Sequence, residues 1–198
     1  MADPELICSE EAFRQLRTEC GKIICIDKRL PSFVFTQSFD KYFAIEYNYI
    51  FKRNFGEFLF NISNITKDES INYMILDPDP THYHDRWSSA FGLVSFKPEG
   101  LKERYVPVMA REQKTPKLLV SVNVGVFWGS SLKWGIFCDR ISWELAVIAV
   151  PQDVDVPAIS GFRCMDASWL SSYEQSQYFT KPHIALDFVK KFSANYAI

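Results

Sequence analysis

Residues 118–150 carry the pattern that most restricts the fold of this chain of 198 residues. A period of two residues runs through their first part, where Val120, Val122, Val124, Val126 and Trp128 alternate with Ser121, Asn123 and Gly125. That period is typical of a strand with one buried face. The apolar segments 133–139 and 143–150 follow, and the short break between them predicts a hairpin. We therefore expect adjacent antiparallel strands, whose buried side chains are Val120, Val122, Val124, Val126, Ile136, Leu145, Val147 and Ile148.

Earlier segments add further strands. Residues 22–27, 32–35 and 41–51 are rich in aromatic and β-branched side chains, which favours strands. The third segment also fits a helix, so both interpretations stay open for it. Residues 71–77 form a short apolar strand that ends at two Asp-Pro pairs, because proline pushes the preceding residue out of the helical region and donates no hydrogen bond to a sheet.

Helical periodicity occurs mainly near the two ends of the chain. Ser9 is a natural N-cap for a helix through Cys20, and Asn54 with Glu57 resembles a capping box for a helix to about Thr66. Residues 165–178 and 182–192 predict two closing helices, while Pro107 prevents residues 99–112 from forming one straight helix. Together these elements predict an α+β fold in a single domain over residues 1–198, with a mainly antiparallel sheet covered by helices.

Composition narrows the classes of partner. Hydrophobic residues make up 47% of the chain, which favours a packed core over disorder. The 22 basic and 24 acidic residues are scattered, so we expect no nucleic-acid partner. No signal-peptide pattern or apolar run of roughly 20 residues occurs, so we expect no membrane partner. The five cysteines show no zinc-type spacing, which favours buried, reduced thiols and a cytoplasmic location.

The densest group of chemically useful side chains lies in residues 76–87, LDPDPTHYHDRW, which contain Asp77, Asp79, His82, His84 and Asp85. Asp79, His82 and His84 could supply two nitrogens and an oxygen to a metal. Histidines two positions apart diverge on a helix, however, and Thr81 suits the helix N-cap. We therefore predict a strand exit and helix cap without a bound metal or cofactor.

An acid/base pair of Asp77 or Asp79 with His84 is also conceivable, but no nucleophile motif accompanies it. The chain is therefore predicted not to be an enzyme. The alternative is a small metal-dependent hydrolase or nuclease centred on Asp79, His82 and His84.

Three tryptophans, Trp128, Trp134 and Trp143, lie close to Asp139 and Arg140. Tryptophans in a sheet usually fill the core, whereas charged residues at a hairpin tip are exposed and can anchor a partner. We predict Asp139 and Arg140 as the accessible partner-binding residues. An aromatic pocket that binds a small ligand is a further possibility.

Residues 73–150 as a whole resemble uncharacterised bacterial proteins of the polymorphic-toxin immunity type. The resemblance rests on the strand that runs into Asp77-Pro78-Asp79-Pro80, and on the strand from Trp134-Gly135 that continues through Asp139-Arg140 to Glu144-Leu145-Ala146. It implies a cytoplasmic protein without chemistry of its own that binds and blocks a cognate protein toxin by stoichiometric complex formation. It implies no catalytic residue.

Overall fold

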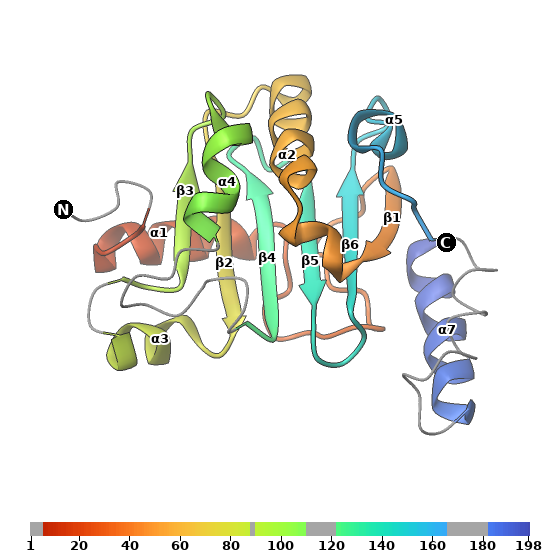
Figure 1. The fold of residues 1–198 in the computed structure, drawn as a ribbon. Coiled ribbons are helices and arrows are strands. Elements are labelled where there is room, and N and C mark those ends of the chain that lie inside the picture. The colour runs from red at the N-terminus through yellow and green to blue at the C-terminus, as the bar shows by residue number, and fades with distance from the viewer. Residues whose placement is uncertain (1–5, 88–89, 110–121, 166–181) are drawn as a thin grey trace.

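The computed structural model describes residues 6–87, 90–109, 122–165 and 182–198 (Figure 1). In chain order the elements are α1 (Glu10–Gly21), β1 (Lys41–Glu46), the 3-10 helix η1 (Tyr47–Phe51), α2 (Arg53–Thr66), β2 (Ile71–Asp77), α3 (Pro80–Trp87), β3 (Leu93–Phe96), α4 (Leu101–Met109), β4 (Val124–Gly129), β5 (Gly135–Asp139), β6 (Leu145–Val150), α5 (Val156–Ser160) and α7 (Pro182–Tyr196).

The six strands form one sheet in the order β1-β6-β5-β4-β2-β3. Every pairing in it is antiparallel, which confirms the predicted α+β class and the adjacent strands β4, β5 and β6. The strand β1 lies at one edge, so residues from the first quarter of the chain pair with β6 from the third quarter.

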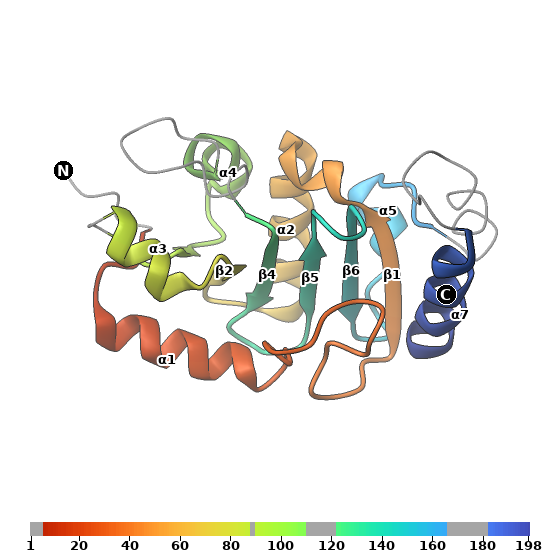
Figure 2. The same ribbon diagram turned by 90° about the horizontal axis from the view of Figure 1, so that it is seen from below.

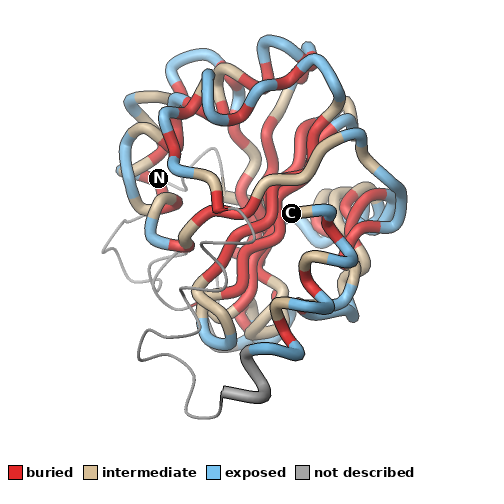
Figure 3. Tube along the Cα trace, turned by 90° about the vertical axis from the view of Figure 1, so that its right-hand side faces the viewer, coloured by how far each residue is buried: buried red, intermediate tan, exposed pale blue. Residues whose placement is uncertain are grey.

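Helices cover both faces of the sheet, as Figure 2 shows. One face packs under α2, α4 and α5, and the other packs under α1, the segment 22–40 and α7, which lies beside β1. Figure 3 shows the strands as a continuous buried band between these layers. Every residue of β4, β5 and β6 is buried, so the prediction of a single buried face was wrong. The predicted buried side chains of this region are buried, and Val120 lies outside the described residues.

The first helix begins as its sequence predicts, because the Ser9 hydroxyl accepts a hydrogen bond from the Ala12 N–H at 3.4 Å. The second helix, α2, does not begin as its sequence predicts. Its N-cap is Lys52, which makes no side-chain capping bond, and Glu57 pairs with Lys102 at 2.6 Å instead of capping the helix. The 3-10 helix η1 leads directly into α2, so the chain is already turning before Asn54 and the predicted capping box is not used.

Two predicted strands are absent from the sheet. Segments 22–27 and 32–35 meet only at an isolated bridge between Ile24 and Phe35. Their apolar side chains are buried against one face of the sheet. These segments therefore leave water by packing on the sheet and not by joining it as strands. Segment 41–51 divides into a strand and a 3-10 helix.

One of the two predicted closing helices is confirmed, and the region around Pro107 is helical. Within the described residues, the helix α4 continues through Pro107 to Met109. The predicted closing helix over 182–192 is confirmed and extends to Tyr196, whereas residues 166–178 of the other lie outside the described residues. The five thiols are free, with Cys20 and Cys138 buried as predicted but Cys8 exposed. In the described part of the chain, no helix is both long and apolar enough to cross a membrane.

Candidate functional site

The stretch 76–87 is a strand exit followed by a helix cap. The Asp79 carboxylate accepts a hydrogen bond from the Thr81 N–H at 2.8 Å and another from the Thr81 hydroxyl. Asp79, and not Thr81, therefore caps the start of α3. Burial opposes ionisation there, but the bonds from Thr81 and the positive charge of Arg17 hold the pKa of Asp79 below its ordinary value. Asp77 is likewise engaged, since its Oδ2 accepts from the Asn123 Nδ2 at 3.0 Å.

The two histidines of this stretch do not gather around one point, although the charge of His82 also helps to lower the pKa of Asp79. His82 is exposed, whereas the His84 ring stacks on Phe91 with centroids 4.4 Å apart, and Phe91 in turn stacks on Phe13 at 4.3 Å. The Nδ1 atom of His84 lies 3.8 Å from a carboxylate oxygen of Asp85. Among the described residues, no group of three or more histidines, cysteines or acidic residues could hold a metal ion. The structure therefore does not assemble Asp79, His82 and His84 into a ligand set.

Asp139 is buried, although its charge predicted an exposed position at a hairpin tip. It is the last residue of β5, its side chain is 0% exposed, and it lies between Val124 of β4 and Leu145 of β6. The prediction that its carboxylate is accessible to a partner was therefore wrong. Arg140 is half-buried, and its N–H donates to the Asn123 carbonyl at 2.8 Å.

Two hydrogen bonds and a ring contact hold the turn that follows β5. The Asp139 Oδ1 accepts from the Ser142 N–H at 2.9 Å, and the Trp143 indole donates to the Leu30 carbonyl at 3.1 Å. The Trp143 ring also stacks on Phe188 of α7, with centroids 3.7 Å apart. The prediction that tryptophans fill the core is confirmed for the fully buried Trp128 and Trp134, while Trp143 packs under the turn.

Ile141 projects from this turn and was missed by the sequence reasoning. Its side chain is 68% exposed, more than that of any other large hydrophobic residue in the described ranges. The available signal was an isoleucine placed between two strands, directly after Arg140. The turn therefore exposes Ile141, next to the half-buried Arg140 and the buried Asp139.

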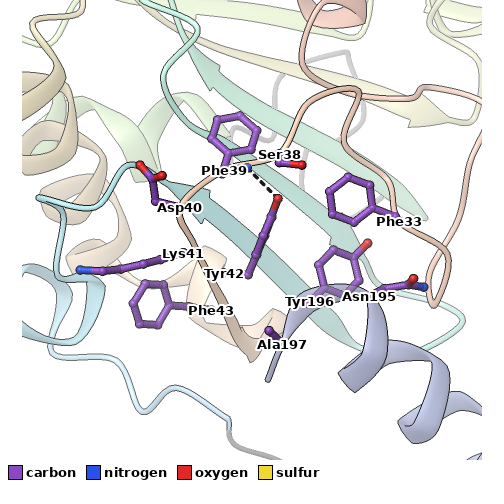
Figure 4. Close-up of a pocket in the computed structure, with 10 residues that line it drawn as sticks. All are labelled: Phe33, Ser38, Phe39, Asp40, Lys41, Tyr42, Phe43, Asn195, Tyr196 and Ala197. Carbon is purple, nitrogen blue, oxygen red and sulfur yellow. Dashed lines mark hydrogen bonds between the residues drawn. The ribbon is translucent and has the colours of Figure 1, made fainter.

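A second candidate site is an aromatic groove of about 580 Å³ at the edge strand β1. Figure 4 shows that it combines β1 and the segment before it with the end of α7; the lining residues are Phe33, Ser38, Phe39, Asp40, Lys41, Tyr42, Phe43, Asn195, Tyr196 and Ala197. The Tyr42 ring lies 5.7 Å from that of Phe33 and 5.6 Å from that of Tyr196. The sequence suggested an aromatic pocket without naming its residues, because the two contributing segments lie far apart in the chain.

Hydrogen bonds hold the walls of the aromatic groove. The Tyr42 hydroxyl accepts from the Phe39 N–H at 2.8 Å, and the Tyr196 hydroxyl accepts from the Val34 N–H at 3.0 Å while donating to the Ser32 carbonyl at 2.7 Å. Burial raises the pKa of Tyr42, and the charge of Asp40 adds to that effect. Both tyrosines are therefore neutral donors and acceptors at physiological pH.

Comparison with protein-family models, with curated proteins and with solved structures finds no match to this chain. The resemblance of residues 73–150 to immunity-type proteins therefore stays a prediction.

Proposed function

We propose that this chain is a non-enzymatic binding protein of the immunity type, which neutralises a bacterial protein toxin by forming a stoichiometric complex. The observation that carries the proposal is the β5–β6 turn, residues 140–144, in which an exposed isoleucine follows an arginine. Hydrogen bonds of Ser142 and Trp143 order the backbone of this turn. The resemblance of residues 73–150, which include this turn, supplies the class of partner.

The turn has the properties of a preorganised contact. An isoleucine kept in water forgoes about 1.5–3 kcal/mol that burial would provide, and a complex can recover it. The hydrogen bonds of Ser142 and Trp143 restrict the turn before any partner arrives, so little ordering entropy remains to be lost on binding. Arg140 adds a long-range charge that favours association with an acidic surface. The partner surface expected here therefore combines an apolar pocket for Ile141 with an overall acidic charge.

The test is co-expression with the product of the neighbouring gene, where the proposal places the toxin, followed by calorimetric titration of the purified proteins. The wild type should rescue growth and bind at one to one. Ile141→Asp should weaken binding about 30-fold or more, the scale of an interface hot spot, and Arg140→Glu should mainly slow association. Asp139 is left unchanged, because a reversed charge there would be buried and would disrupt the fold.

Leu186→Asp is the matched control, since Leu186 of α7 is 60% exposed and the change is the same in kind. It should leave the affinity within a few-fold of wild type. Failure of the wild type to bind or to rescue would reject the proposed function. Full rescue and unchanged affinity for both turn variants would reject only the choice of contact surface.

The aromatic groove favours a second candidate function, the binding of a small ligand. Its rings offer an apolar wall, and Asp40 at the rim offers a carboxylate for a cationic group. Tryptamine, which combines an indole with an ammonium group, is a suitable probe. Nuclear magnetic resonance (NMR) titration should shift the Tyr42 signals in the wild type, and Tyr42→Ala should abolish binding. Unshifted signals at millimolar tryptamine would reject this candidate.

A further inference from the structure

The carboxylate of Asp139 occupies a costly position in the sheet. It is fully buried, and within the described residues its Oδ2 has no hydrogen-bond partner. A buried carboxylate that is only partly compensated lowers stability by several kcal/mol relative to a well-packed apolar residue. Packing alone therefore does not explain an aspartate at the end of β5.

What this carboxylate provides is an acceptor for the turn that follows it. Its Oδ1 accepts from the Ser142 N–H at 2.9 Å, three residues further along the chain. The same turn holds a second unfavourable feature, because Glu144 has a φ of 51° although it is not glycine. A turn that contains two unfavourable features persists only where surrounding contacts define it.

We propose that Asp139 is the positioning residue of the β5–β6 turn: its ionised carboxylate fixes the backbone conformation in which Arg140 and Ile141 are presented. The inference rests on the proposed function only for the biological use of the turn. In this role Asp139 never contacts the partner, which reconciles its burial with its place beside the candidate contact residues.

The surroundings of the Asp139 carboxylate make the conformation of the β5–β6 turn sensitive to pH. Burial raises the pKa of Asp139 above its ordinary value, against the hydrogen bonds from Ser142 and the Trp143 backbone and the positive charge of Arg29. The other titratable or charged groups that sense it or adjoin it are Tyr47 of η1, Cys138 of β5 and Arg140 of the turn. Because Tyr47 and Cys138 both have pKa values raised by burial, they stay neutral while Asp139 titrates.

Protonation of Asp139 has two effects of opposite sign. Since the folded-state pKa is raised, the contribution of this group to global stability is highest at low pH and is lost as the pH rises through the folded pKa. The turn responds in the other direction, because a neutral carboxyl is a weaker acceptor for the Ser142 N–H than a carboxylate. Low pH should therefore weaken the hydrogen bond that orders the turn, while it removes the destabilising buried charge from the core.

The experiment is hydrogen exchange of single amides in the isolated, ¹⁵N-labelled full chain, read by NMR between pH 3 and pH 7. The Ser142 amide reports the bond to Asp139, and the Arg140 amide, which donates to the Asn123 carbonyl at 2.8 Å, is the internal control. Asp139→Ala should lower Ser142 protection about tenfold or more with little change at Arg140, as expected for loss of a bond to a charged group. In the wild type, Ser142 protection relative to Arg140 should fall as Asp139 is protonated.

Asp139→Asn keeps an acceptor oxygen and removes the charge, so its Ser142 protection should be independent of pH. Equal Ser142 protection in wild type and Asp139→Ala would overturn the proposal, as would a wild-type profile that matches Asp139→Asn. If Asp139→Ala does not fold, the comparison of wild type with Asp139→Asn still decides. No toxin is used, so a negative result rejects the role of Asp139 and leaves the proposed function standing, while failure of toxin binding has the reverse meaning.

Discussion

Replacing Val124 with aspartate would place an acidic residue directly between Asp77 and Asp139 in one row of the sheet. Val124 is buried in β4, opposite Asp139 of β5 on one side and opposite Asp77 of β2 on the other. The new carboxylate would have an ionisable neighbour on each side and apolar groups above it. We expect this single change to remove most of the free energy of unfolding near neutral pH.

Three contributions set the expected magnitude. Loss of the buried valine side chain costs about 1.5–3 kcal/mol. Directly opposite residues have Cβ atoms about 5 Å apart, so two ionised carboxylates there repel by about 3 kcal/mol at an effective dielectric constant near 20. Desolvation of the new charge adds several kcal/mol. The sum exceeds about 5 kcal/mol, which reaches the whole stability of many domains.

Urea unfolding of Val124→Asp and Val124→Asn at pH 7 and pH 4 isolates the contribution of charge. The asparagine variant shares the loss of valine and the burial of a polar group, but it carries no charge. The aspartate variant should be less stable by about 3 kcal/mol or more at pH 7. The gap should narrow at pH 4, because the folded-state pKa of the new carboxyl is raised and its destabilisation is relieved as the pH falls through that pKa. Equal stability of the two variants at pH 7 would refute the assigned register and the burial of this row.

Three smaller changes test other parts of the fold. Asp68→Ala removes the acceptor of the Trp134 indole N–H, which lies 2.7 Å from Oδ2, and should destabilise by about 1–3 kcal/mol in urea unfolding; unchanged stability would exclude that bond. Gly125→Ala would place a Cβ 2.5 Å from the Tyr73 hydroxyl and should cost about 1–3 kcal/mol, visible as a lower Tm by calorimetry. Ser9→Ala should cost about 1 kcal/mol through loss of the α1 cap, and an identical Tm would contradict that role.

Local pattern was sufficient for elements whose partners lie nearby in the sequence. The cap at Ser9 predicted α1, and the alternation that starts at residue 120, with the two apolar segments after it, predicted the strands β4 to β6. Such patterns report directly on local backbone geometry. The two Asp-Pro pairs also predicted the strand exit at residues 76–80, and a helix follows it.

Tertiary packing decided what periodicity does not encode. Segments 22–27 and 32–35 have the composition of strands, yet they bury their side chains on a face of the sheet without joining it. Polarity alone predicted an exposed Asp139, but it is buried between the neighbouring strands β4 and β6. The sequence determined which residues are apolar and how the chain turns locally. Only the three-dimensional arrangement determined which polar residue is buried and which apolar one, Ile141, is exposed, because exposure depends on distant segments that pack over a site.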